Sequence, residues 1–200
     1  MTQLVLDLRG NGGGIMDAAV EIADEFLTGD KLITYTEGAH KKKEEYRCRR
    51  NGMFEEGKLV VLADEGTASA SEILIGALQD WDRATIVGRR TFGKGLVQEQ
   101  FNLSNRGALR LTVSRYYTPL GRSIQRAYAT GNEKYFSEVQ NSDFHSDSAT
   151  VDTSGKKFKT ASGKTLYEGG GIAPDVWVAS DTSSISYAMA YMYGNRLVNQ

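Results

Sequence analysis

The chain has 200 residues, 40% of them hydrophobic, and a formal net charge of −1 at pH 7. This content is sufficient for one compact domain with a real core. A net charge so close to zero argues against nucleic acid as the main partner. No apolar stretch reaches the length of a membrane span, and the first residues do not have the pattern of a signal peptide.

The first predicted elements are a strand and a helix joined by a glycine-rich turn. Residues 4–8 form a short apolar run that predicts a core strand, and apolar residues recur at helical spacing over 19–26. The glycines of the turn at 10–14 permit positive φ angles and close approach of a ligand. Their spacing matches neither nucleotide-binding pattern, so we expect an oxyanion-binding turn in preference to a phosphate site.

A charged segment follows at residues 41–50. Glu44 and Glu45 interrupt its lysines and arginines, which favours the polar face of a hairpin over a binding patch. The single cysteine, Cys48, lies between two arginines. We predict an exposed strand residue there, with a reactive thiol as the alternative.

A second strand-to-helix turn carries the most informative serine. Residues 59–63 predict a strand buried on both faces, and apolar residues at helical spacing over 73–81 predict a helix. Ser69 lies between them, where the free N–H of Ala70 at a helix start could face an oxyanion. The alternative is that Ser69 or a neighbouring hydroxyl only caps the helix.

Lys94 follows Ser69 by 25 residues, within the segment Thr91-Phe92-Gly93-Lys94-Gly95. A lysine can accept a proton only when its neutral form is favoured, which requires burial among apolar groups away from carboxylates. Phe92, Leu96 and Val97 are suitable neighbours. The pair therefore predicts a serine nucleophile with a lysine base, and the alternative is a surface lysine in a glycine turn.

The remaining elements are a hairpin, an insertion and a closing helix. Residues 97–103 and 108–117 alternate as two strands joined by a short turn. Residues 126–168 are polar and predict an insertion with loop and hairpin character, partly mobile. Residues 183–199 have the spacing of a helix.

Four sequence motifs resemble the catalytic domain of the C-terminal processing peptidases, also called tail-specific proteases. The motifs are LVLDLRGNGGG, VLADEGTASASEILIGALQDWDRATIVGRRTFGKGLVQ, LTVSRYYTPLGRSIQ and GGGIAPDVWV, in family order along the chain. The resemblance implies an α/β fold, a ClpP/crotonase-like ββα superhelical core with a mixed sheet extension. It also implies a serine endopeptidase that cleaves proteins near their C-termini by a Ser-Lys acyl-enzyme mechanism.

The resemblance assigns roles to individual residues. Ser69 is the expected nucleophile, Lys94 the general base and Gln98 the group that orients the lysine amine. The expected oxyanion hole uses the N–H of Ala70 and one N–H of the glycine turn, with Gly13 and Gly14 favoured. Glu72 matches a family position, and its alternative role is a first-turn glutamate facing the helix dipole. No metal or cofactor is expected.

Two other functions remain open at this stage. One is a different Ser-Lys hydrolase, an amidase or esterase, and the other is a non-catalytic binding module on the same fold. His40 and His145 lie in charged or polar stretches, so neither is predicted to serve as a triad base or a metal ligand. The expected partners are polypeptide substrates, with a second copy of the chain or an adaptor protein as further candidates.

Family members carry a signal segment and a PDZ domain before this point, so we expect residues 1–200 to be a catalytic domain truncated at its N-terminus. The resemblance implies the bacterial cell envelope, on its periplasmic side.

Overall fold

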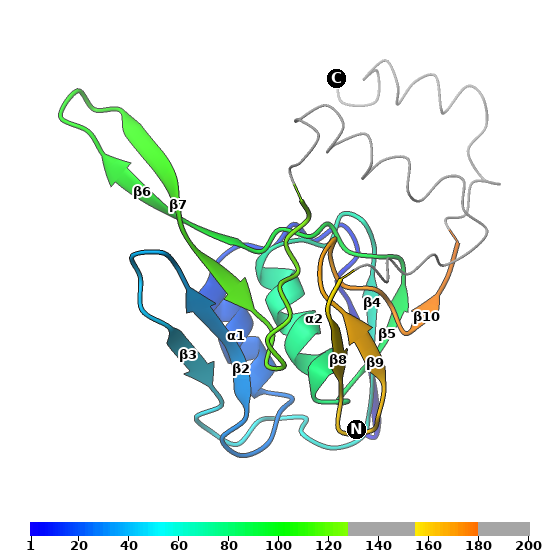
Figure 1. Cartoon of the computed structure of the whole chain (residues 1–200). Coiled ribbons are helices and arrows are strands. Elements are labelled where there is room, and N and C mark those ends of the chain that lie inside the picture. The colour runs from blue at the N-terminus through cyan, green and yellow to red at the C-terminus, as the bar shows by residue number, and fades with distance from the viewer. Residues whose placement is uncertain (128–154, 180–200) are drawn as a thin grey trace, which may run out of the picture.

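The computed structural model describes residues 1–127 and 155–179. These residues form a parallel sheet, an antiparallel sheet and a small hairpin, with the helix α2 between the two larger sheets (Figure 1). In chain order the elements are β1 Gln3–Asp7, α1 Met16–Asp24, β2 Leu32–Glu37, β3 Glu44–Arg47, β4 Lys58–Ala63, α2 Ala70–Asp80, β5 Thr85–Gly88, β6 Leu96–Asn102, β7 Ala108–Tyr117, β8 Lys157–Lys159, β9 Thr165–Tyr167 and β10 Val176–Trp177.

The parallel sheet has the strand order β1-β4-β5-β10, and all of its pairs are parallel. The predicted strand at 59–63 corresponds to β4, which lies between β1 and β5 and is buried at Leu59, Val61 and Ala63. The predicted strand at residues 4–8 corresponds to β1, in which Leu4 and Leu6 pack against the core, and the buried Leu8 directly after β1 belongs to the core cluster. Among the described strands β1 is at the edge of its sheet, and Val5 is 61% exposed.

The core is built around α2. Every residue of this helix is buried, because one side packs toward the parallel sheet and the other toward β2 and α1. Leu74 and Leu78 belong to the same cluster of buried side chains as Val61, Ile86 and Ile33. A helix that is enclosed on all sides gives its first residue, where the site begins, a fixed position.

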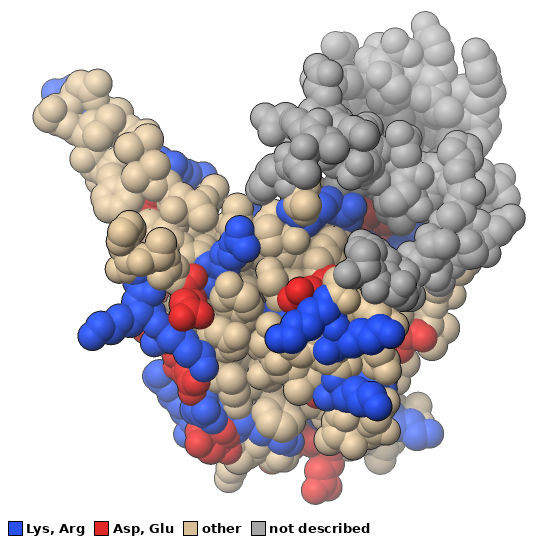
Figure 2. All heavy atoms as spheres, in the orientation of Figure 1, with Lys and Arg blue, Asp and Glu red and all other residues tan. Residues whose placement is uncertain are grey.

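The antiparallel sheet has the order β3-β2-β7-β6 and confirms the predicted hairpin at 97–117. The far end of β6 and β7 projects beyond the body of the molecule (Figure 1). The β2–β3 pair carries the charged segment, and Figure 2 shows its basic residues interspersed with acidic ones. Glu45 forms ion pairs with Lys43 and Arg47, which agrees with a solvated hairpin face.

Cys48 corrects a prediction from the sequence. It follows β3 directly and is 5% exposed, so it is a buried residue, not an exposed strand residue. Burial, and to a smaller extent the nearby Asp24 carboxylate, raise the pKa of its thiol to about 11.

The predicted insertion at 126–168 contains the hairpin β8–β9, as expected for its described part. Residues 128–154 and the predicted helix at 183–199 lie outside the described residues. Within the part of the chain that is described, no helix is both long and apolar enough to cross a membrane.

Candidate active site

Ser69 lies at the junction of β4 and α2, as the N-cap residue of the helix. Its backbone has φ 58° and ψ −119°, a region that residues with a Cβ rarely occupy. The Ser69 N–H donates to Glu72 Oε2 at 2.8 Å, which gives the strained turn one fixed hydrogen bond. A strained serine at a strand-to-helix turn is the arrangement in which a nucleophile is presented at the end of a sheet.

The glycine turn packs directly against this serine. A Cβ at Gly13, where φ is 82°, would lie 2.4 Å from the Ala68 carbonyl oxygen and 2.6 Å from the Ala70 nitrogen. The Ala68 N–H donates to the Asn11 carbonyl at 3.0 Å, and the Gly13 N–H donates to Asn11 Oδ1 at 3.0 Å. The N–H of Gly13 is therefore already engaged within the turn.

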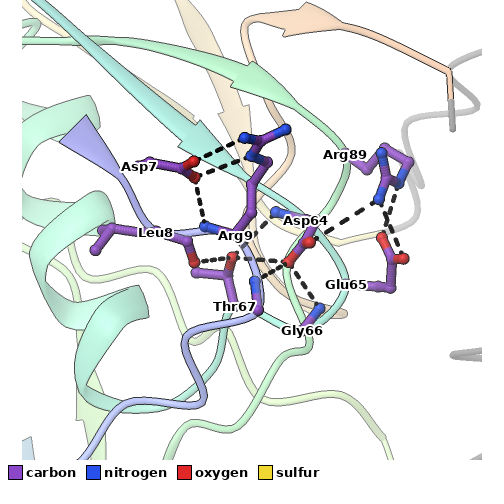
Figure 3. A network of polar contacts seen from close by, with 9 residues as sticks. Asp7, Leu8, Arg9, Asp64, Glu65, Gly66, Thr67 and Arg89 are labelled. Carbon is purple, nitrogen blue, oxygen red and sulfur yellow. Dashed lines mark hydrogen bonds and ion pairs between the residues drawn. The ribbon is translucent and has the colours of Figure 1, made fainter. Parts of the chain in front are cut away.

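A polar network behind the site holds the two turns together (Figure 3). Asp64 Oδ1 accepts hydrogen bonds from the backbone N–H groups of Gly10 at 2.8 Å and Gly66 at 3.0 Å. The fully buried Thr67 donates to the Leu8 carbonyl at 2.8 Å and accepts from the Asp64 N–H at 3.0 Å. The C-terminal ends of β1 and β4 are thus linked through side chains as well as through the sheet.

Glu72 connects the serine turn to the lysine loop. Its side chain is 0% exposed and accepts from four donors: Oε2 from the N–H groups of Ser69 and Lys94, and Oε1 from the Gly93 N–H and the Thr91 hydroxyl. Burial raises the pKa of Glu72, while these hydrogen bonds act in the opposite direction. The predicted absence of carboxylates concerned the Lys94 amine, whereas the contact seen here joins the Glu72 carboxylate to the Lys94 backbone N–H.

Tyr116 is a residue of the site that the sequence reasoning missed. It lies in β7, is 2% exposed, and its hydroxyl lies 2.6 Å from the Lys94 carbonyl oxygen and 3.0 Å from the Ser69 carbonyl oxygen. Burial raises the pKa of Tyr116 well above its usual value, and the Glu72 carboxylate acts in the same direction. The phenol is therefore a neutral hydrogen-bond donor at working pH.

The predicted site residues meet at one pocket of about 420 Å³. Its lining includes Ser69, Ala70, Lys94, Gln98 and Gly14. The rest of the lining combines apolar and polar side chains, those of Met16, Ile73, Leu96, Val97, Tyr116, Gln100 and Arg110. Gly13 and Glu72 are not among the lining residues, but Gly13 packs against the serine turn and Glu72 accepts from the Ser69 N–H.

His40 is exposed and is not among the residues of this pocket, as its charged context predicted, whereas His145 lies outside the described residues. Among residues 1–127 and 155–179, no group of His, Cys, Asp and Glu could hold a metal ion. The side chains that line the pocket include a hydroxyl, an amine, two amides, a guanidinium and a phenol.

Residues 1–135 match the model of peptidase family S41. The chain belongs to this family. The match covers the glycine turn, the serine turn, the lysine loop and the β6–β7 hairpin.

Curated relatives are named as C-terminal processing proteases, the family that the sequence motifs resemble. The chain is 45% identical over 121 residues to a carboxy-terminal-processing protease of Bartonella bacilliformis, covering 60% of this chain and 28% of the relative. It is 44% identical over 122 residues to a carboxyl-terminal-processing protease of Synechocystis, covering 61% and 28%. The chain therefore spans under a third of the length of these relatives.

Solved structures agree on the fold. A photosystem II D1 C-terminal processing protease matches with a TM-score of 0.63 and 31% identity, over 90% of this chain and 35% of that one. Mature CPAF matches with a TM-score of 0.57 at 12% identity, over 98% of this chain and 43% of that chain, which supports the fold alone. The predicted α/β fold is confirmed, and among the described strands the predicted mixed sheet extension is the antiparallel sheet β3-β2-β7-β6.

Proposed function

We propose that this S41 chain is the catalytic part of a serine endopeptidase that cleaves polypeptides near their C-termini, with Ser69 as nucleophile and Lys94 as general base. The observation that carries the proposal is that Ser69 and Lys94, from separate loops, line one pocket while Glu72 accepts from the backbone N–H of both. The names of the curated relatives support the substrate class.

In the proposed reaction Ser69 Oγ attacks the carbonyl carbon of the scissile peptide, and the neutral Lys94 amine takes the hydroxyl proton. The C–N bond then breaks, and the proton passes from Lys94 to the leaving amine. Water, activated by the same lysine, hydrolyses the resulting ester and frees Ser69. Gln98, on the same pocket wall, is the proposed partner that orients the lysine amine.

The proposed oxyanion hole uses the N–H groups of Ala70 and Gly14. Both residues line the pocket, and Ala70 is the first residue of α2, where backbone N–H groups lack helical acceptors. Gly13 is the weaker candidate of the two predicted glycines because its N–H already donates to Asn11. The Gly13 backbone instead allows the close approach of the two turns.

The cellular setting is also part of the proposal. Several of the curated relatives are bacterial, and the periplasmic side of the cell envelope rests on the family resemblance. A PDZ domain preceding these residues, and a second copy or an adaptor as partner, rest on the family resemblance alone.

The test consists of two separate assays. The first measures labelling by a fluorophosphonate probe that reacts with activated serines, and the second measures cleavage of an unstructured protein by the unlabelled chain. Ser69→Ala should abolish labelling, and Lys94→Arg should be nearly as damaging as Lys94→Ala, because arginine keeps its charge but cannot accept a proton at working pH. Lys42→Arg, at an exposed position, is the matched control and should label normally.

Substantial labelling of Lys94→Arg would show that the lysine supplies charge and not proton transfer. Labelling of Ser69→Ala at the wild-type rate would overturn the nucleophile assignment. Hydrolysis of small esters without any cleavage of peptides would favour the amidase or esterase alternative.

A further inference from the structure

Tyr116 contacts the backbone of both residues of the proposed dyad. Its hydroxyl has one proton and lies near two carbonyl oxygens, at 2.6 Å from Lys94 and 3.0 Å from Ser69. The Ser69 carbonyl also accepts from the N–H groups of Glu72 at 2.9 Å and Ile73 at 3.1 Å. The shorter bond to Lys94 is therefore the one for which the hydroxyl matters most.

The backbone of Tyr116 holds the next residue of the lysine loop. The Tyr116 N–H donates to the Gly95 carbonyl at 3.1 Å, so the strand and its side chain together fix two consecutive carbonyls. The loop cannot shift along β7 without losing both bonds. β7 is itself anchored by β2 on one side and β6 on the other.

The lysine loop is hydrogen-bonded at every backbone polar group of Gly93, Lys94 and Gly95. Three N–H groups donate to side chains: those of Gly93 and Lys94 to Glu72, and that of Gly95 to Gln125 Oε1 at 2.8 Å. Of the three carbonyls, that of Gly93 accepts from the Arg126 N–H at 2.9 Å and the other two accept from Tyr116. Since a lysine side chain is long and flexible, the position of its amine depends on how firmly its backbone is held.

We propose that Tyr116 is a positioning residue that fixes the lysine loop against the serine turn and so sets the spacing of Ser69 and Lys94. It acts as the counterpart of Glu72: the carboxylate accepts from the N–H groups of the two residues, and the phenol donates chiefly to the Lys94 carbonyl while it contacts that of Ser69. This inference rests on the proposed Ser-Lys function. Misplacing a catalytic group by about 1 Å can lower a rate by roughly a hundredfold.

The test measures saturable labelling of the chain by a fluorophosphonate, which separates the maximal rate, kinact, from the concentration dependence, KI. Tyr116→Phe removes only the hydroxyl and should lower kinact by roughly tenfold or more, with KI within about twofold. Tyr116→4-aminophenylalanine keeps a donor at the same place and should recover most of kinact.

Two controls separate positioning from general stability. Tyr117→Phe makes the same change on the next residue, whose ring stacks on Tyr35, and should leave kinact unchanged. Ile33→Val in the buried core of β2 costs about 0.5–1.5 kcal/mol of stability and should also leave kinact unchanged. All measurements are made well below the unfolding midpoint of each variant.

Three outcomes would contradict the positioning role, and a fourth would contradict the proposed function. A kinact for Tyr116→Phe within about twofold of wild type, or equal losses in Tyr116→Phe and Ile33→Val, would overturn the positioning role. Should Tyr116→Phe fail to fold, a folded 4-aminophenylalanine variant with kinact as low as that of Lys94→Ala would overturn it as well. Wild-type chain that does not label at Ser69 would refute the proposed function itself, and this inference with it.

Discussion

At the scale of single residues, Ser69 carries a conformational cost that can be measured. Its φ of 58° is unfavourable for any residue with a Cβ but ordinary for glycine. Ser69→Ala and Ser69→Gly both remove the hydroxyl, so their difference isolates the Cβ. We expect Ser69→Gly to exceed Ser69→Ala by about 1 kcal/mol in free energy of unfolding, measured in urea. An alanine variant as stable as the glycine variant would show that the turn is not strained.

Cys48 gives a prediction for pH dependence. Its folded pKa, raised to about 11 from the usual 9.0, means that the folded state holds the thiol proton more tightly than the unfolded state. The associated stability is fully present below pH 9.0 and is lost as the pH rises toward 11. Thiolate absorbance should therefore appear near pH 11, and the unfolding free energy should fall over the same range. Cys48→Ala should remove this part of the slope; titration near the usual value would contradict the buried assignment.

At the scale of elements, the site depends on the linkage of two strand-to-helix turns. The hydroxyl of Thr67 links the end of β4 to the Leu8 carbonyl after β1, and the side chain is fully buried (Figure 3). Thr67→Val keeps the shape but leaves the Asp64 N–H without its acceptor and the Leu8 carbonyl with only the Asn11 N–H, which costs about 1–3 kcal/mol. We expect this loss in unfolding free energy together with slower probe labelling of Ser69.

Thr85→Val is the matched control, because Thr85 is an exposed residue of β5 and valine suits a strand. It should change neither stability nor labelling appreciably. Equal effects of the two substitutions would indicate that the Thr67 hydroxyl does not couple the turns.

At the scale of the whole molecule, the sequence predicted those elements and site residues that depend on the residue pattern within one short segment. The apolar runs and helical spacing located β4, α2 and the β6–β7 hairpin, and the motifs located Ser69 and Lys94 in loops that line one pocket. These features depend on periodicity and turn chemistry within short segments. They could therefore be read before the arrangement of the sheets was known.

What the sequence did not predict depends on contacts between distant segments. Cys48 is buried because α1 residues such as Asp24 pack near it, and Val5 is exposed because it lies on the face of β1 opposite Leu4 and Leu6, which pack against the core. The roles of Tyr116 and Glu72 arise from hydrogen bonds that span 19 residues or more along the chain, apart from the local bond of Glu72 to Ser69. No periodicity of one segment encodes such a contact.

The β6–β7 hairpin has two unlike faces. Gln98, Gln100 and Arg110 lie on a polar face and line the pocket, while the opposite face carries exposed apolar residues. These are Phe101, Leu103, Leu109 and Leu111. The pocket therefore uses the part of the hairpin nearest the body, and the projecting end contributes little burial (Figure 1).

We expect this projecting end to open independently of the fold. A two-stranded ribbon with exposed side chains is only marginally stable, so amides of residues 101–109 should exchange with solvent far faster than those of β4 and α2. Gln100 and Arg110 are cross-strand partners, so residues 101–109 can be replaced by Asn-Gly, which favours a two-residue hairpin turn. The shortened chain should keep its unfolding free energy within about 0.5 kcal/mol and label at Ser69 normally.

Leu78→Ala, a cavity in the centre of α2, is the contrasting variant and should cost about 2–5 kcal/mol. The unfolding free energies of the two variants show whether the helix between the sheets or the hairpin end contributes more to stability. Slow exchange at Phe101 or Leu109, or a loss on shortening comparable to that of Leu78→Ala, would show that the hairpin end is covered. Because every residue of α2 is buried and the hairpin end is exposed, we expect the helix to carry the stability and the hairpin end to be dispensable for it.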